Sequence, residues 1–174
     1  MPTYPRIEVS VDVVALTMVD RSLHALLVKR GREPFAGHWA LPGAWLEVDE
    51  DLAPSAAREL HHETGIALHP DELRQIGTYG DVHRDPRRRV VSVAHLAEVE
   101  DFIDPEVGAG ASDAAWVPVA DVLRTGADPM AFDHARHLRD GVAASRWSGS
   151  AASWAHPAPE TDDWQPPRSW GERG

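Results

Sequence analysis

Residues 43–50 read GAWLEVDE, residues 58–66 read RELHHETGI, and seven residues separate the two stretches. Apolar residues recur at helical spacing over 51–63, which predicts an α-helix there. Glu59 and Glu63 lie four residues apart on this helix, so both carboxylates leave the same face. Adjacent carboxylates repel each other unless a cation lies between them, and a hard divalent cation is the natural candidate. An isolated pair of this kind is also common on solvated surface helices, so the pair alone leaves both interpretations open.

Further polar groups flank this helical pair. His62 follows Glu59 by three residues and lies beside the carboxylates, while Glu50 lies in the loop that leads into the helix. Asp51 suits the N-cap position, and Gly65 suits the left-handed conformation that ends many helices. The stretch therefore predicts a well-delimited helix that carries several polar groups near one point.

The rest of the chain alternates strand-like and helix-like patterns. Apolar, β-branched residues over 7–19 predict a buried strand, and residues 23–29 predict its neighbour after a turn at 20–22. The remaining expected elements are strands at about 74–82, 89–99 and 116–118, a helical turn near 119–124, and a last helix over 131–143 with Phe132, Ala135 and Leu138 facing inward.

Composition excludes several classes of protein. The chain has 174 residues, of which 43% are hydrophobic, and this suits one domain with a proper core. It has no cysteine, which excludes disulfides and thiol chemistry. We expect a cytoplasmic protein without a membrane partner, because no apolar run is long enough to span a bilayer and the N-terminus lacks a signal-peptide core. The net charge of −11 argues against nucleic-acid binding, which needs a basic surface.

The composition changes from about Gly141, so we divide the chain into a domain over 1–143 and a tail over 144–174. The tail is rich in Ala, Ser and Pro, which favours disorder. Disordered segments are, however, usually poor in aromatic residues, and tryptophans could anchor the tail on the domain or across a homodimer. The tail holds four of the seven tryptophans, at positions 147, 154, 164 and 170.

The stretch from 44 to 66 resembles the Nudix box. That motif is a glycine, five residues, Glu, seven residues, Arg-Glu, an apolar residue, any residue, Glu-Glu, any residue, glycine and an apolar residue. Similarity to the family extends over roughly residues 6–143, and AFDHA at 131–135 resembles the branch that includes ADP-ribose pyrophosphatases. The residues that match the box are Glu50, Arg58, Glu59, Leu60, Glu63, Gly65 and Ile66.

This resemblance implies an α/β fold, the Nudix α/β/α sandwich with a mixed central sheet. It implies metal-dependent hydrolysis of a diphosphate linkage in a nucleoside diphosphate derivative, with an ADP-ribose-like compound as the first expectation. Glu59 and Glu63 would hold Mg²⁺ or Mn²⁺, and Glu59 would also help to activate water. Arg58 would orient Glu59 through a charge-assisted bond, and Glu50 would support the metal site.

Two positions depart from the box. Ala44 replaces its opening glycine, although an alanine still permits close backbone approach where its φ is negative. His62 replaces the first glutamate of the Glu-Glu pair, which removes a hard oxygen ligand. His62 either ligates the metal, which would favour Mn²⁺, or faces water or Glu59. The alternative function is therefore a catalytically weak or inactive nucleotide sensor that acts through a protein partner.

The substrate side of the site is less constrained by the motif. Arginines near the predicted hairpin would face phosphates, although arginines in a turn such as Asp85-Pro86 are usually solvated. Glu106 or Asp113 would supply a further acidic group, and the remaining histidines show no spacing typical of metal ligands. The predicted substrate-binding residues are Arg30, Arg84, Arg87 and Tyr79, with Trp39, Trp45 and Phe35 as further candidates for stacking a base.

Overall fold

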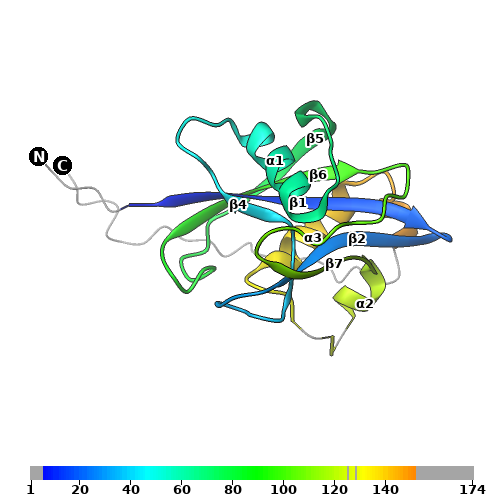
Figure 1. Cartoon of the computed structure of the whole chain (residues 1–174). Coiled ribbons are helices and arrows are strands. Elements are labelled where there is room, and N and C mark those ends of the chain that lie inside the picture. Colours follow the sequence, from blue (N-terminus) through cyan, green and yellow to red (C-terminus); the bar gives the residue numbers. More distant parts are fainter. Residues whose placement is uncertain (1–5, 125, 128, 152–174) are drawn as a thin grey trace, which may run out of the picture.

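The computed structural model describes residues 6–151 except 125 and 128. These residues form one mixed sheet with helices on both faces (Figure 1). The strands are β1 (Glu8–Val19), β2 (Ser22–Arg30), β3 (Trp39–Ala40), β4 (Gly43–Trp45), β5 (Leu73–Tyr79), β6 (Val90–Glu98) and β7 (Ala111–Pro118). The helices are α1 (Leu52–Thr64), α2 (Val119–Leu123) and α3 (His134–Ala144), with short 3₁₀ helices η1 (Pro70–Glu72) and η2 (Ser148–Ala151).

The sheet has the strand order β3-β2-β1-β6-β5, with β4 added to β1 and β7 added to β2. Strands β1 and β6 are parallel, and the other pairs are antiparallel. β1 and β2 pair only between 16–19 and 22–25, beyond which β4 takes the free edge of β1 at residues 10–12. The two long strands therefore separate toward one end of the sheet.

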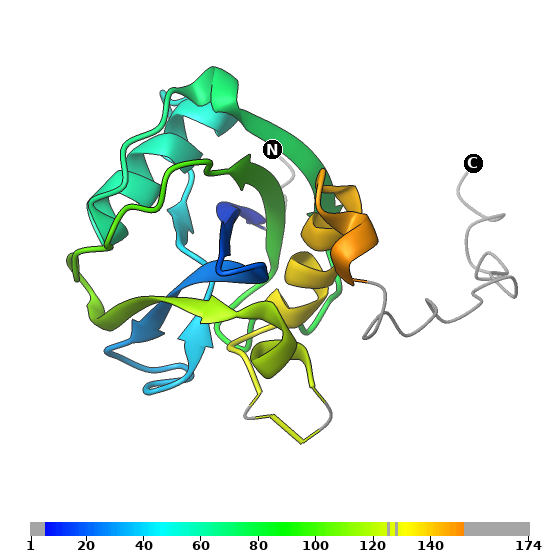
Figure 2. The same ribbon diagram turned by 90° about the vertical axis from the view of Figure 1, so that its right-hand side faces the viewer.

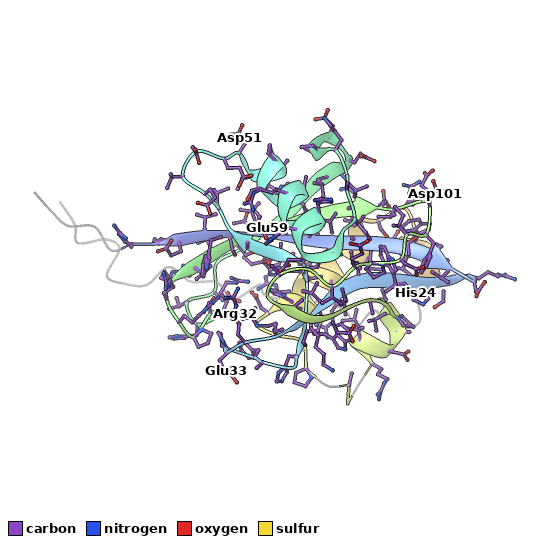
Figure 3. The ribbon with its side chains drawn as sticks, viewed as in Figure 1. His24, Arg32, Glu33, Asp51, Glu59 and Asp101 are labelled. Carbon is purple, nitrogen blue, oxygen red and sulfur yellow. The ribbon has the colours of Figure 1, made fainter. Side chains whose placement is uncertain are left out.

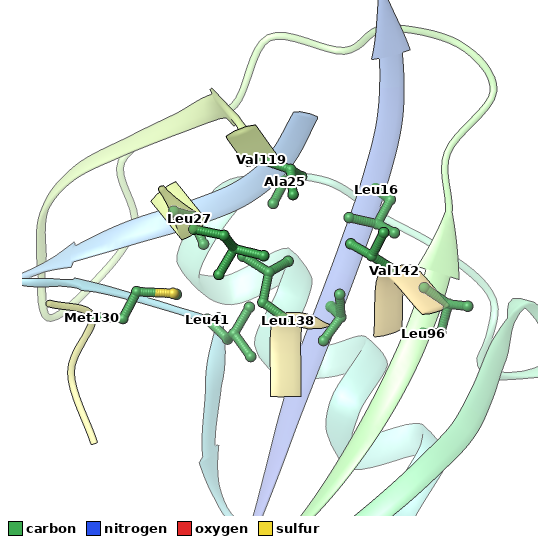
Figure 4. Close-up of a cluster of buried hydrophobic side chains, with 11 residues drawn as sticks. Leu16, Ala25, Leu27, Leu41, Leu96, Val119, Met130, Leu138 and Val142 are labelled. Carbon is green, nitrogen blue, oxygen red and sulfur yellow. The ribbon is translucent and has the colours of Figure 1, made fainter. Parts of the chain in front are cut away.

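Strand β1 is buried on both of its faces because its alternate residues belong to two different apolar clusters. Val14 and Leu16 pack with Leu138 of α3 in one cluster (Figure 4). Val13 packs with Leu60 of α1 in the other. Figure 2 shows α1 and α3 on opposite sides of the sheet. The expected α/β/α sandwich with a mixed sheet is confirmed.

Helix α1 has the predicted ends, but its start is held differently from the expectation. Asp51 takes the N-cap position with extended backbone, yet its side chain makes no capping hydrogen bond. Its carbonyl instead accepts a hydrogen bond from the Ser55 N–H. Gly65 ends the helix with φ 72°, a conformation that glycine adopts without steric cost.

The last helix begins later than the sequence predicted. Phe132 has φ 54°, so residues 131–133 form a turn and α3 starts only at His134. This turn is tied to β3 by a hydrogen bond from the Ala131 N–H to the Trp39 carbonyl, 2.8 Å long. The expectation that Phe132 faces inward from a helix is therefore wrong, whereas Leu138 is fully buried as expected.

Only the first part of the predicted tail lies within the described residues. Trp147 is partly buried against the α3-side cluster. The tryptophans at 154, 164 and 170 lie outside the described residues, so the prediction of a docked tail stays a prediction. In the described part of the chain, no helix combines the length and the apolar character needed to cross a membrane.

Candidate active site

A cavity of about 520 Å³ opens where β1 and β2 separate, beside the face of α1 that carries the two glutamates. Strand β1 contributes Asp12, the loop after β2 contributes Arg32 and Glu33, and α1 contributes Glu59 and Glu63. Figure 3 shows Glu59 between α1 and the sheet, and Arg32 and Glu33 on the loop after β2. The helix that the sequence predicted therefore presents its carboxylates to this cavity.

The carboxylate of Glu63 is held by the backbone of β4. Its Oε2 accepts a hydrogen bond of 2.9 Å from the Gly43 N–H. Burial raises the pKa of Glu63 to about 7, and the negative charges of Glu59 and Asp12 act in the same direction. Without a cation, this carboxyl therefore pays a large cost for being charged.

Glu59 is held by an arginine of its own helix. Arg58 contacts Glu59 through its Nη1 and binds Glu50 through two hydrogen bonds of 2.8 and 2.7 Å. These bonds lower the pKa of Glu50, the hydrogen bond from Arg58 being the largest cause. Arg58 is therefore placed to fix the orientation of Glu59. Glu50 contacts Arg58 but is not among the cavity-lining residues.

The two departures from the box lie at the cavity wall. Ala44 has no positive φ, so its backbone is compatible with the alanine side chain. The side chain of His62 is 58% exposed, and its Nδ1 lies 3.7 Å from Glu59 Oε2. His62 thus faces both solvent and Glu59 and lies next to the carboxylate pair.

The close contact between the backbones of β4 and β1 is made by Gly43, one residue before Ala44. A Cβ atom at Gly43 would collide with the Val11 carbonyl and with Asp12 Oδ1. Glycine at this position is therefore required by the tight contact between β4 and β1, and this contact places the N–H that binds Glu63.

Arg30 and Arg87 bring positive charge to the cavity that Glu59 and Glu63 also line. Arg87 is held by two hydrogen bonds to Asp85, of 3.0 and 2.7 Å, and its guanidinium lies over Trp45 at 4.9 Å and Phe132 at 5.4 Å. Arg30 donates to the Pro34 carbonyl at 2.7 Å and lies over Phe132 at 4.9 Å. Burial and the neighbouring Arg87 lower the pKa of Arg30, as expected for two cations that share one site.

Two of the predicted substrate residues have other partners. Arg84 lines the cavity, but its side chain is only 3% exposed and forms an ion pair of 2.7 Å with Asp133. Tyr79 is buried and donates a hydrogen bond of 2.7 Å to Asp140. Tyr79 also stacks on His137 and is not among the residues that line the cavity. Its position gives no support to a substrate role.

Asp12 is the acidic group that sequence reasoning missed. Neither Glu106 nor Asp113 lines the cavity, whereas Asp12 does, from the middle of the buried strand β1. A carboxylate in the buried interior of an apolar strand is the signal that could have identified it. Sequence spacing also gave no sign of a histidine cluster. In the structure, His134 and His137 lie beside Asp12, with candidate ligand atoms within 4.8 Å of one another.

The candidate stacking residues differ in their positions. Trp39 and Phe35 do not line the cavity, but Trp45 does.

Comparison with known proteins agrees with this geometry. The model of the NUDIX domain family matches residues 7–140. An ADP-ribose pyrophosphatase of Methanocaldococcus jannaschii is 32% identical over 75% of this chain and 70% of its own length. An ADPR responsive transcriptional repressor of Acinetobacter baylyi is 30% identical, and the match covers 80% of this chain but only 55% of the repressor. The NUDIX domain of Shewanella oneidensis NrtR, solved with ADP ribose, has a TM-score of 0.71 and 33% identity, covering 79% of this chain and 87% of that domain.

The family match covers most of the chain and includes every residue that forms the cavity wall. The expected class of enzyme, a pyrophosphohydrolase, is confirmed by the family and by the similar ADP-ribose pyrophosphatase. The chain belongs to the NUDIX hydrolase family, in its ADP-ribose pyrophosphatase-like branch.

Proposed function

We propose that this protein hydrolyses the diphosphate linkage of a nucleoside diphosphate derivative, with ADP-ribose as the first candidate, and that Glu59 and Glu63 hold the divalent cation that it needs. The observation that carries the proposal is the meeting of these two carboxylates with two arginines across one cavity. A diphosphate carries negative charge, and the cavity offers both a cation site and guanidinium groups that can compensate it.

The residues present fit Mg²⁺ or Mn²⁺. Both ions prefer oxygen ligands, and Glu59 and Glu63 supply carboxylate oxygens on adjacent turns of α1. The raised pKa of Glu63 supports this assignment, since a buried carboxylate next to another is stabilised in its charged form by a cation. When bound, the cation withdraws charge from the diphosphate and makes a water molecule easier to deprotonate.

The protein's own groups have separate tasks in this scheme. Arg58 holds one carboxylate oxygen of Glu59, which leaves Oε2 on the side of His62, and we assign proton acceptance from the attacking water to this oxygen. The Gly43 N–H holds Glu63 in place. Arg30 and Arg87 bind phosphate oxygens, and Asp85 fixes the plane of the Arg87 guanidinium. We assign Trp45 and Phe132, which flank Arg87, to the apolar part of the substrate.

A nucleotide sensor with little turnover is the second candidate function. His62 favours it, because the imidazole replaces a hard ligand of the box. The similarity to an ADPR responsive transcriptional repressor also favours it. The net charge of −11 supports a protein partner over a nucleic-acid partner for such a sensor. The expectations of a homodimer and of a cytoplasmic location stay predictions.

One experiment separates the two functions. ADP-ribose, sugar nucleotides, dinucleotides and nucleoside triphosphates are each incubated with the full chain and either Mg²⁺ or Mn²⁺, and the products are separated by chromatography. Hydrolysis that is lost in Glu59→Gln and Glu63→Gln supports the enzyme. Binding of ADP-ribose in calorimetry, without hydrolysis under any condition, supports the sensor. The absence of both binding and hydrolysis would refute both functions.

A further inference from the structure

We propose that His134 is a positioning residue for the reaction proposed above: its imidazole, which lies beside Asp12, fixes the backbone of residues 41–43 and thereby the N–H that binds Glu63. The proposal rests on the proposed function where it concerns turnover. It concerns the buried polar group of Asp12, His134 and His137 where α3 meets β1, of which Asp12 and His134 also line the cavity.

The hydrogen bonds of His134 determine which of its nitrogens carries the proton. The Leu41 N–H donates to His134 Nδ1 at 3.0 Å, so Nδ1 acts as an acceptor and Nε2 carries the hydrogen of the neutral ring. Nε2 lies 3.6 Å from Asp12 Oδ1. Burial lowers the pKa of His134 to about 4, so the ring is neutral near pH 7.

This arrangement argues against a second cation site, although a carboxylate and two imidazoles meet here. A cation at His134 Nε2 would displace the proton that the Leu41 hydrogen bond requires at that atom. The Arg84 guanidinium also lies 3.9 Å from Asp12 Oδ2 and already supplies positive charge. The group therefore joins α3 to the sheet through close polar contacts, with His134 Nε2 3.6 Å from Asp12 Oδ1 and His137 Nδ1 3.5 Å from Asp12 Oδ2.

The network reaches Glu63 through a short stretch of backbone. The turn before α3 binds residues 39–41 twice, through the Ala131 N–H to the Trp39 carbonyl and through His134 to Leu41. Two residues after Leu41, the Gly43 N–H donates to Glu63 Oε2. Leu41 is almost fully buried, and its N–H loses its hydrogen-bond partner if His134 is lost. The 41–43 backbone would then shift to satisfy that N–H and would move the Gly43 N–H away from Glu63.

Asp12 constrains the same stretch from the other side. It pairs with Gly43 in the register of β1 and β4, and its Oδ1 closely approaches the Gly43 backbone. Ser92 also donates a hydrogen bond to Asp12, which fixes this carboxylate from β6. His134 and Asp12 therefore hold the 41–43 segment between them at the wall of the cavity.

Two substitutions of His134 separate the effect of its hydrogen bond to Leu41 from the effect of changing the volume of its side chain. In His134→Asn the amide oxygen takes the place of Nδ1 and can accept from Leu41, whereas in His134→Gln the amide lies at the place of Nε2 and reaches only Asp12. We expect His134→Gln to lower kcat at least about 10-fold with KM nearly unchanged, because small misplacements of catalytic groups cost that much. We expect His134→Asn to keep kcat within about 3-fold of wild type. His95→Asn is the control, since His95 is another buried histidine that does not bond to residues 39–43.

Mn²⁺ affinity, measured by electron paramagnetic resonance, gives a readout that does not require turnover. His134→Gln should weaken Mn²⁺ binding, while His134→Asn and His95→Asn should not. If Mn²⁺ affinity falls only in His134→Gln but the wild-type protein hydrolyses no substrate, the proposed reaction is refuted and the positioning role of His134 is retained. Equal Mn²⁺ affinity and equal kcat in all variants would refute the positioning role alone.

The wild-type protein supplies a test that does not depend on how the variants fold. Nitrogen-15 resonances of the histidine rings should show His134 as the neutral tautomer protonated at Nε2 near pH 7. A ring protonated at Nδ1, or charged at both nitrogens, would overturn the proposal.

Discussion

Replacing Glu63 by glutamine should stabilise the metal-free protein while abolishing its turnover. Glutamine has the same shape, and its amide oxygen can still accept the Gly43 N–H bond. The pKa of Glu63 is raised from 4.5 to about 7, mainly by burial. The unfolded chain therefore releases this proton at lower pH than the folded chain, and stability falls as pH rises from about 4.5 to about 7 and then stays level.

The size of the effect follows from that difference in pKa. At pH 8 the charged carboxyl costs the metal-free fold at most about 3 kcal/mol, and at pH 5 the cost is about 1 kcal/mol or less. Urea unfolding in the presence of EDTA, at both pH values, measures the gain in Glu63→Gln. Glu47→Gln is the matched control, because it removes a carboxylate from an exposed side chain. A gain in Glu63→Gln that is independent of pH, or a loss at pH 8, would refute the argument from burial, and full metal-dependent activity would remove Glu63 from the metal site.

Three further substitutions test other parts of the site. His62→Glu should increase turnover with Mg²⁺ more than with Mn²⁺, because it restores a hard ligand, and unchanged rates with both ions would make His62 a bystander. Arg87→Lys should raise KM for ADP-ribose about 10-fold, since lysine keeps the charge but loses the planar contact with Asp85, and an unchanged KM would exclude Arg87 from phosphate binding. Tyr79→Phe should cost about 1 kcal/mol in urea unfolding through the lost bond to Asp140, and an increase in KM would return Tyr79 to the substrate site.

Local spacing was enough to predict the helix and the carboxylates of the candidate site. The period of α1, its glycine end and the pair Glu59 and Glu63 all depend on residues within about one helical turn of one another, so the sequence displays them directly. The strands of the main sheet were also visible as apolar runs, and β3 and β4 were missed because they are only two and three residues long.

The parts that the sequence did not reveal depend on distant pairing. Asp12 contacts His134 because β1 packs against α3, although more than a hundred residues separate the two in the sequence. No local sequence pattern indicates this contact. Phe132 was assigned to a helix because it continues an apolar helical period, yet its positive φ ends that period and brings its ring over Arg30. Tertiary hydrogen bonds, such as that from Ala131 to Trp39, outweighed the local preference there.

The burial of β1 on both of its faces has a consequence for the exchange of its amide hydrogens with solvent. Because alternate side chains of this strand belong to the two apolar layers, neither α1 nor α3 can detach without uncovering residues of β1. Regions that are protected from both sides exchange their amide hydrogens only when the whole domain unfolds. The central amides of β1 should therefore exchange with deuterium at the rate of global unfolding, although Asp12 of the same strand lines the cavity.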